Sequence, residues 1–223
     1  MIRRWVLAQE EILAKEFDSH KFILTDQRVT KREEWQRIAK QSHQWQQNSE
    51  EFFAVPVLPV KFANGVMSFP APFASFHSEN AQCFGEYFPA GNRRKAVVIL
   101  GHWNSSKESY NNLANFYQRF GISALRLTLP YHDQRRPGDV PLAHGLLSAD
   151  IELTINSIRQ AVVEVRRAVH WLLEQGHQDI GIVGSSMGSM VGLFALCHEK
   201  KVSSFVGYLS AANFPAVVWQ GSA

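Results

Sequence analysis

The sequence predicts an α/β protein, built on a mostly parallel sheet with helices on both of its faces. Short apolar runs of the kind that form fully buried strands recur along the second half of the chain, at 96–100, 122–129, 179–183 and 204–210. Between these runs lie longer stretches with helical spacing, the longest of which ends near residue 174 and is followed by Gly176. Strands that alternate with helices imply right-handed crossovers, which place helices on both faces of the sheet.

The N-terminal part of the chain follows a different pattern. Helical spacing predicts two helices in this part, at 4–17 and 31–48. Two prolines exclude a central strand from the segment that follows, residues 53–60. Two further runs are typical of antiparallel strands, at 66–77 and 82–88. We therefore expect two units, an N-terminal helical extension over 1–60 and an α/β core over 61–223.

The composition excludes several classes of protein. The chain has 223 residues, of which 45% are hydrophobic and 19% are charged, as in a folded globular protein. Its net charge is +3, and because Lys and Arg are interspersed with Asp and Glu, we expect no nucleic-acid partner. Apolar runs fall short of the ~20 residues of a membrane-spanning helix, and the N-terminus turns acidic too early for a signal peptide. We expect a cytoplasmic protein without membrane association.

The two cysteines, Cys83 and Cys197, lie 114 positions apart and have no metal-binding or redox spacing. In a cytoplasmic protein such cysteines are typically buried thiols, and we expect both to be buried.

The pentapeptide Gly184-Ser185-Ser186-Met187-Gly188 carries the clearest functional signal. It fits the Gly-x-Ser-x-Gly pattern in one frame only, with Ser186 as the candidate nucleophile. A sharp turn from a buried strand into a helix would strain this serine, and Gly184 and Gly188 would prevent collisions beside it. The backbone N–H of Met187 would then face a developing oxyanion. The alternatives are an ordinary tight turn and a phosphate-binding loop, but the latter lacks the Gly-Lys-Ser/Thr sequence.

From about residue 82 to residue 211 the chain resembles the α/β-hydrolase superfamily, particularly its esterase and dienelactone-hydrolase-like members. Besides the pentapeptide, the run Glu164-Val-Arg-Arg-Ala-Val-His-Trp-Leu172 is similar to the family's helix before the nucleophile. In the family a His-Gly-x loop supplies the second oxyanion N–H, and the corresponding residues here are Gly101-His102-Trp103, with the first two in reversed order. The resemblance implies an α/β-hydrolase core, Trp103 as the second donor, and neither a metal nor an organic cofactor.

The loop after the strand at 122–129 borders the active-site mouth in the family. We therefore expect this loop to form a pocket rim with Tyr131, His132, Asp133 and Arg135. His102, from the loop after the strand at 96–100, would complete this rim. The alternative is a solvated, charged turn. The segment also resembles a branch of α/β-hydrolase domain-containing proteins, which adds lipid acyl esters to the substrate classes considered.

The general base and its acid are the missing parts of this site. In the family both follow the nucleophile, but after Ser186 the chain contains a single histidine and a single carboxylate, His198 and Glu199. At a rise of ~1.5 Å per residue, these lie about 17 Å from Ser186 along the helix. One explanation is that the chain is truncated and incomplete at its C-terminus, so that acid and histidine lie beyond residue 223. The other is an upstream pair, drawn from His102 or His132 with Asp133 or Asp150. We expect the first.

The function expected from these residues is hydrolysis of carboxylic esters by a serine nucleophile, with a small-molecule ester as the substrate. An acyltransferase or a lipid-acyl hydrolase would use the same turn. The rival from another class is a non-catalytic α/β-hydrolase-fold protein that binds a ligand or partner, which the reversed order of Gly101 and His102 favours. The sequence leaves the oligomeric state open.

Overall fold

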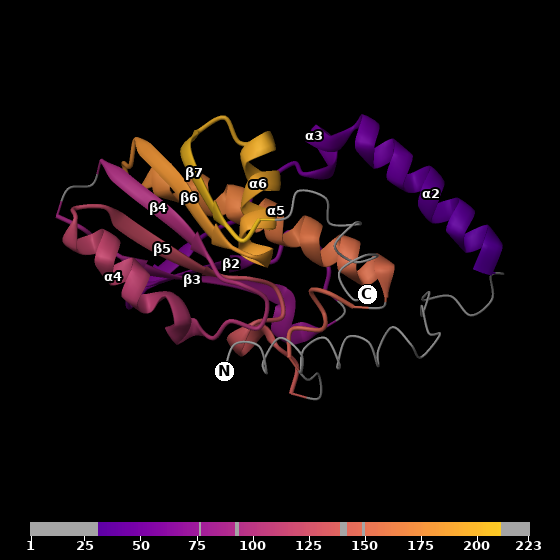
Figure 1. The fold of residues 1–223 in the computed structure, drawn as a ribbon, viewed down its shortest axis with the longest axis horizontal. Coiled ribbons are helices and arrows are strands. Elements are labelled where there is room, and N and C mark those ends of the chain that lie inside the picture. Colours follow the sequence, from indigo (N-terminus) through magenta and orange to yellow (C-terminus); the bar gives the residue numbers. More distant parts are fainter. Residues whose placement is uncertain (1–30, 76, 92–93, 139–141, 149, 211–223) are drawn as a thin grey trace.

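A seven-stranded mixed sheet lies at the centre of the described part of the chain (Figure 1). The structure is a computed structural model and describes residues 31–75, 77–91, 94–138, 142–148 and 150–210. The strands are β1 (Lys61–Ala63), β2 (Val66–Pro70), β3 (Gln82–Phe88), β4 (Lys95–Leu100), β5 (Ser123–Thr128), β6 (Asp179–Ser185) and β7 (Val202–Tyr208). The α-helices are α2 (Lys31–Gln47), α3 (Ser49–Phe52), α4 (Asn111–Arg119), α5 (Ile151–Glu174) and α6 (Met187–His198), and the 3-10 turns are η1 (Ser78–Ala81), η2 (Lys107–Tyr110) and η3 (Asp133–Arg135).

The sheet is mostly parallel, as the sequence predicts. Its order is β1-β2-β3-β5-β4-β6-β7. β4 pairs in parallel with β5 and β6, and β6 pairs in parallel with β7. β3 is antiparallel to β5 and β2 is antiparallel to β3, so β2 and the four parallel strands share one direction. β2 is shorter than the expected 66–77, because it ends at Pro70, which has no N–H to continue the ladder.

Helices cover both faces of the sheet, which confirms the α/β prediction. On β4, Ala96, Val98 and Leu100 belong to the larger core, which packs against α5 and α6. The alternate residues Val97 and Ile99 belong to a smaller core beneath α4. None of the helices in the described ranges has both the length and the apolar character needed to cross a membrane.

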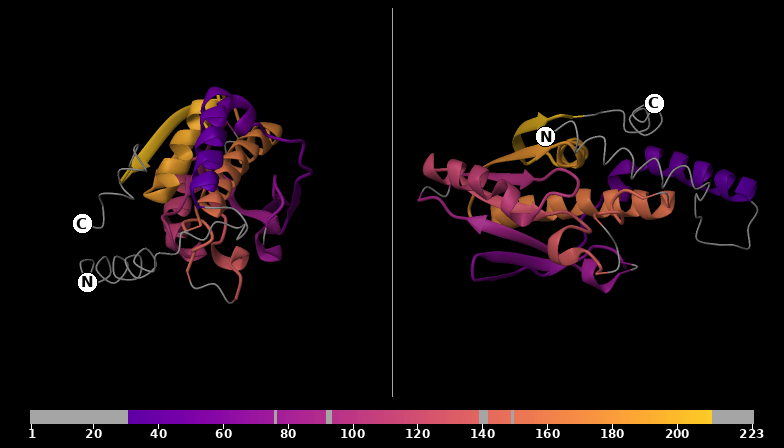
Figure 2. Two further views of the ribbon diagram at one scale, coloured as in Figure 1. Left: turned by 90° about the vertical axis from the view of Figure 1, so that its right-hand side faces the viewer. Right: turned by 60° about the horizontal axis from the view of Figure 1, so that its bottom comes forward.

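Three arginines on α5 bind the backbone at the end of α3 and in the segment that follows it. Each donates from its guanidinium to a carbonyl oxygen: Arg159 to Phe52, Arg166 to Phe53 and Arg167 to Leu58. Figure 2 shows α2 beside α5, where Arg37 of α2 pairs with Glu152 of α5. The predicted helix over 31–48 is confirmed as α2, whereas the predicted helix over 4–17 lies outside the described residues. The unit boundary at residue 60 stays a prediction.

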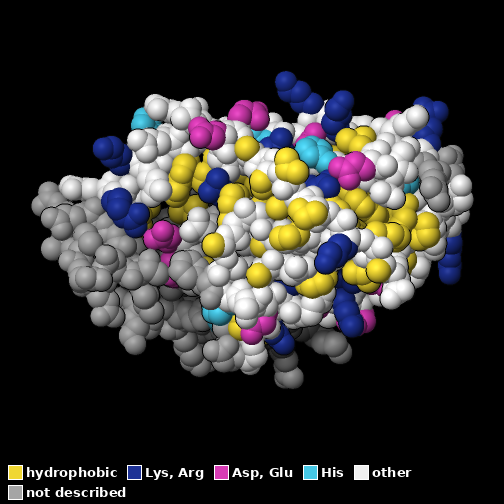
Figure 3. Space-filling view, turned by 180° about the vertical axis from the view of Figure 1, so that it is seen from behind, with side chains coloured by type: hydrophobic (Ala, Val, Ile, Leu, Met, Phe, Trp, Pro, Cys, Tyr) yellow, Lys and Arg dark blue, Asp and Glu magenta, His cyan; other side chains and the backbone are white. Residues whose placement is uncertain are grey.

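The surface seen from behind carries dispersed hydrophobic side chains with Lys and Arg between them (Figure 3). The large exposed apolar residues include Phe116 on α4 and Phe120 directly after this helix, whose ring centroids lie 4.7 Å apart. Cys83 is buried, as predicted, and burial raises the pKa of its thiol well above the usual value. The prediction for Cys197 is wrong: this residue is exposed in the last turn of α6, because it lies on the side of the helix turned away from the sheet.

A buried ion pair joins the loop after β5, residues 129–136, to α5. The Arg135 guanidinium donates to both carboxylate oxygens of Glu164 at 2.7 and 2.8 Å, and both side chains are at most 1% exposed. Arg135 also donates to the Thr128 carbonyl at 2.7 Å, and Gln160 donates to Glu164 at 2.8 Å. Burial opposes the charge on Arg135, but the nearby Glu164 carboxylate outweighs it and raises the pKa of Arg135. The pair therefore fixes this loop, which we call the β5 loop, to the core.

Removing one partner of this pair should destabilise the protein strongly. We expect Glu164→Ala to lower the free energy of unfolding by about 3–5 kcal/mol, because the Arg135 charge stays buried without a counter-ion. Urea unfolding measures this loss, and the double variant R135M/E164L should recover much of it. Asp179→Ala removes a partner of Arg94 from an exposed ion pair and should cost at most about 1 kcal/mol. A Glu164→Ala variant no less stable than Asp179→Ala would contradict the assignment.

Candidate active site

Ser186 stands alone between β6, which ends at Ser185, and α6, which begins at Met187. Its backbone has φ 51° and ψ −115°, a conformation that non-glycine residues rarely adopt. The side chain of Ser186 is exposed, whereas Ser185 is half-buried. The strand–turn–helix arrangement expected for the pentapeptide is therefore present, with Ser186 rather than Ser185 at the strained position.

The two glycines of the pentapeptide are required by close backbone packing. A Cβ atom on Gly184 would overlap with the carbonyl group of Gly188. A Cβ atom on Gly188 would overlap with the carbonyl oxygens of Leu100 and Gly101, at the end of β4. The first turn of α6 thus lies directly against the start of the loop after β4. The glycine spacing predicted from the sequence has this physical cause.

Hydrogen bonds fix the turn and, within the described ranges, leave the N–H group of Met187 unused. The Ser186 N–H donates to the Tyr208 carbonyl at 2.8 Å, on the neighbouring strand β7. The N–H and hydroxyl groups of Ser189 donate to the Ser186 carbonyl, at 2.9 and 2.7 Å. The Met187 N–H has no acceptor among the described residues. It lies at the positive end of α6 and is available to an anion.

The loop after β4, residues 101–106, which we call the β4 loop, contains a tight turn. The Ser105 N–H donates to the His102 carbonyl at 3.1 Å, and the third residue of this turn, Asn104, has φ 61°. A positive φ at this position is typical of a type II turn, and asparagine tolerates it. The flanking N–H groups are bonded, that of His102 to the Tyr110 hydroxyl at 3.2 Å and that of Asn104 to the His132 ring at 3.0 Å.

The N–H of Trp103 is the one in this turn without an acceptor among the described residues. The indole group of Trp103 is held separately, because it donates to the Ala143 carbonyl at 3.1 Å and stacks on the His144 ring at 5.9 Å. The sequence reasoning missed Asn104 and Tyr110. An asparagine two residues after His102 was an available signal, since asparagine is favoured at positive φ.

Two of the five predicted rim residues lie in the core instead. Arg135 is fully buried because it is bonded to Glu164. Tyr131 is 1% exposed, and its ring lies so close to Gly145 that a Cβ atom there would overlap with it. Neither side chain faces solvent, so neither forms a rim.

The other three rim candidates are bonded within the two loops. The Nδ1 atom of His102 lies 2.7 Å from the Tyr110 hydroxyl, and burial lowers the pKa of His102. His132 is 4% exposed. Asp133 accepts the Lys107 N–H at 2.9 Å, and burial raises the pKa of its carboxyl group.

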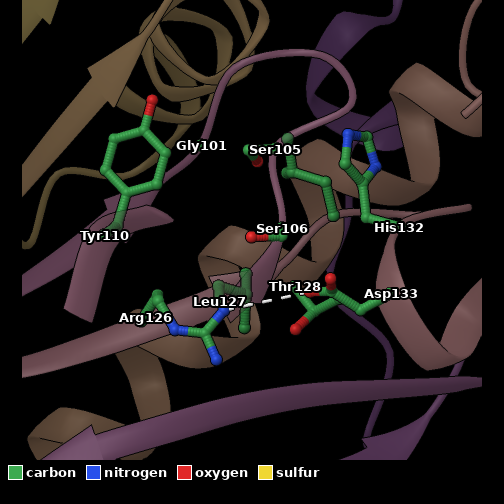
Figure 4. A pocket seen from close by; sticks show the side chains of 10 residues that line it. Gly101, Ser105, Ser106, Tyr110, Arg126, Leu127, Thr128, His132 and Asp133 are labelled. Carbon is green, nitrogen blue, oxygen red and sulfur yellow. Dashed lines mark ion pairs between the residues drawn. The ribbon is translucent and has the colours of Figure 1, made fainter. Parts of the chain in front are cut away.

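A small hollow separates the β4 and β5 loops (Figure 4). Its volume is about 10 Å³, which is room for about one water molecule. His132 and Asp133 line it, together with Arg126, whose guanidinium lies 3.9 Å from the Asp133 carboxylate. Ser186 does not line it. The hollow is therefore too small and in the wrong place to hold an ester substrate.

The described residues contain no proton acceptor for the Ser186 hydroxyl, which has no hydrogen-bond partner among them. His132 uses both ring nitrogens in contacts with the backbone, and Asp150 caps α5 by accepting the Leu153 N–H at 2.9 Å. The upstream pairs considered above are thus not assembled in this conformation. Glu199 is bonded to His170 at 2.8 Å, at the far end of α6 from Ser186. No cluster of metal-binding side chains occurs within the part of the chain that the structure describes.

His132 should make the stability of the fold dependent on pH. Burial, the main cause, lowers the pKa of its imidazole to about 4, whereas a histidine in the unfolded chain has a pKa of about 6.5. Between these values the unfolded state binds a proton that the folded state does not, so stability falls as the pH falls. We expect His132 to account for a loss of about 2 kcal/mol between pH 7 and pH 4.5.

Urea unfolding of the parent and of His132→Gln at both pH values isolates this contribution, because the other ionisable groups are common to the two proteins. The variant should lose less stability than the parent on acidification. An equal loss in both proteins would rule out His132 as the cause.

Comparisons with solved structures found proteins that are similar to part of this chain. The chain is similar to the alpha/beta hydrolase GrgF from Penicillium sp. sh18, with 22% identity and a TM-score of 0.45 over 56% of this chain and 40% of that one. It is also similar to a cold-adapted esterase from an Arctic intertidal metagenomic library, with 22% identity and a TM-score of 0.44 over 66% of this chain and 62% of that one. A third similar structure is a soluble variant of a monoglyceride lipase from Saccharomyces cerevisiae, with 15% identity and a TM-score of 0.41 over 69% of this chain and 44% of that one.

The matched regions span from 40% to 62% of the length of these three structures. Among curated proteins, none matches the sequence. The family model described as alpha/beta hydrolase domain containing 18 matches residues 27–223. This match includes every strand of the sheet, the β4 and β5 loops and the strained turn at Ser186. The chain therefore belongs to the alpha/beta hydrolase domain containing 18 family, within the α/β-hydrolase superfamily.

Proposed function

We propose that the protein is a serine hydrolase of carboxylic esters, with Ser186 as the nucleophile. The observation that carries the proposal is the strained turn between β6 and α6, which exposes Ser186 at φ 51°. A serine held in this way next to a helix N-terminus is typical of a nucleophile that attacks a carbonyl carbon. An ordinary turn would not require a strained serine, because a glycine adopts the same backbone conformation without strain.

The oxyanion would be held by the backbone N–H groups of Met187 and Trp103. Both lack an acceptor among the described residues, although neighbouring N–H groups are bonded. The two groups belong to adjacent loops, because Gly188 packs on the carbonyl oxygens of Leu100 and Gly101. Attack by Ser186 would place negative charge on the carbonyl oxygen, and fixed N–H groups stabilise such charge without reorganisation. Water would then hydrolyse the acyl-enzyme.

The proposal requires a histidine from outside the described residues. A serine hydroxyl is a weak nucleophile at neutral pH unless a base accepts its proton. His102 is bonded to Tyr110 and His132 to Pro130 and Asn104, and within the described residues no hydrogen bond joins either ring to Ser186. No metal or organic cofactor is part of this mechanism, and the cytoplasmic location expected from the sequence stays a prediction.

Two other functions would use the same arrangement. An acyltransferase or a lipid-acyl hydrolase would differ only in the acceptor or in the acyl chain. The third candidate is a ligand-binding protein without catalysis. It is favoured because the Ser186 hydroxyl has no hydrogen-bond partner within the described ranges. The reaction of Ser186 with an activated phosphonate separates this last function from the first two.

Labelling with a fluorophosphonate probe tests the nucleophile directly in the full-length protein. We expect the parent to be labelled at Ser186 and Ser186→Ala to lose labelling by at least about a hundredfold, because the attacking oxygen is removed. The matched control is Ser185→Ala, which changes the adjacent serine and should keep most of the labelling.

We expect ester hydrolysis to be lost in Ser186→Ala and retained in Ser185→Ala, as expected for the labelling. Hydrolysis of short-chain and long-chain p-nitrophenyl esters, measured on the same three proteins, distinguishes an esterase from a lipid-acyl hydrolase. If Ser186→Ala is labelled like the parent while Ser185→Ala is not, the choice of nucleophile is wrong. If the folded parent is neither labelled nor active, the result contradicts the hydrolase function and supports the ligand-binding function.

A further inference from the structure

His132 contacts the backbone of two loops through its two ring nitrogens. Its Nδ1 atom lies 2.9 Å from the Pro130 carbonyl oxygen, which is an acceptor only, so Nδ1 must carry the proton and donate. In the neutral ring Nε2 is then an acceptor, and it receives the Asn104 N–H at 3.0 Å. The β5 loop thus sets the tautomer of His132, and this tautomer binds the β4 loop.

This contact determines the direction of the peptide group next to Trp103. The Asn104 N–H belongs to the peptide that joins Trp103 to Asn104, so His132 fixes the plane of that peptide. On the other side, the His102 carbonyl accepts the Ser105 N–H. In a trans peptide the N–H points opposite to the carbonyl, so the Trp103 N–H points away from Ser105 and stays free. Without His132, the strained φ of 61° at Asn104 would be maintained mainly by its side-chain contact with the Ala143 N–H.

The surroundings keep His132 in its neutral, accepting form. It is 4% exposed, and the charges of the nearby Arg135 and His102 both disfavour a proton on its ring; Tyr110, Arg126 and Asp133 line the hollow beside it. The β5 loop that carries it is itself held by the pair between Arg135 and Glu164. These contacts also exclude His132 as the general base, because its acceptor nitrogen is already occupied by Asn104.

We infer that His132 is a positioning residue, which holds the β4 loop so that the Trp103 N–H is presented to the acyl oxygen. The inference rests on the proposed function of Ser186. It assigns His132 a role in transition-state binding, separate from proton transfer.

A pair of substitutions separates the two nitrogens of the ring. His132→Asn retains a donor for the Pro130 carbonyl at the Nδ1 position and removes the acceptor for Asn104. His132→Gln places an amide oxygen near the Nε2 position and retains that acceptor. We expect the rate of fluorophosphonate labelling at Ser186 to fall about tenfold in His132→Asn and to stay within about threefold of the parent in His132→Gln.

Amide hydrogen exchange, measured by NMR in the full-length protein, reports on the loop without requiring activity. The amide of Asn104 should exchange at least about tenfold faster in His132→Asn than in the parent, and His132→Gln should resemble the parent. Exchange in β4 and β6 serves as the control for global folding, since a positioning role leaves these strands unchanged.

The outcomes separate the two proposals. A parent that is not labelled at Ser186 overturns the hydrolase function, and hydrogen exchange then decides the structural role of His132 alone. Equal labelling and equal Asn104 exchange in the parent and His132→Asn overturn the positioning role. A loss of labelling in His132→Gln as large as in His132→Asn also overturns it, because the retained acceptor would then have no effect.

Discussion

The buried ion pair between Arg135 and Glu164 is the interaction on which the positions of the β5 and β4 loops depend. The β5 loop contains only a short 3-10 turn, so its own hydrogen bonds give it little rigidity. The pair connects this loop to α5 by two short hydrogen bonds, and the Thr128 carbonyl and Gln160 amide satisfy further polar groups around it. Such a pair adds little net stability compared with apolar residues, because both charges lose their hydration. Its contribution is a single defined position for the loop, and through His132 for the β4 loop as well.

The second constraint is the contact between the start of α6 and the end of β4. β4 and β6 are adjacent parallel strands, with Leu100 opposite Gly184, so the loops that follow them leave the same edge of the sheet. Gly188 allows the backbones to touch there. This contact brings the proposed nucleophile, Ser186, and the loop of the proposed oxyanion donor, Trp103, to the same edge of the sheet. The N–H groups of Met187 and Trp103 are backbone atoms, so their identity does not depend on the side chains at these positions. The reversed order of Gly101 and His102 is therefore compatible with a working oxyanion site, provided that the turn at Asn104 is held.

Much of this arrangement could be predicted from local sequence patterns, and the remainder depends on contacts between distant residues. The strands from β2 to β7, α5, α6 and the strained turn follow from hydrophobic spacing and from glycines two residues on either side of Ser186, since these are properties of neighbouring residues. The burial of Tyr131 and Arg135 was missed, because a charged loop is normally solvated and its partner Glu164 lies 29 positions away. The exposure of Cys197 was missed because the sequence does not say which side of α6 faces the sheet. The acceptor role of His132 depends on Pro130 and Asn104 together, and no spacing predicts it.

α5 also binds the N-terminal part of the described chain. The buried side of α5 holds Glu164, and another side holds the three arginines that bind carbonyl oxygens at the end of α3 and in the segment after it. In that segment Phe53 and Leu58 also pack against the main core. Separation at residue 60 would leave three guanidinium groups without these acceptors and would uncover apolar surface. The change of sequence pattern near residue 60 coincides with the change from helices to strands, and the unit boundary there stays a prediction. The extension covers α5, and α5 in turn fixes the β5 loop beside the site.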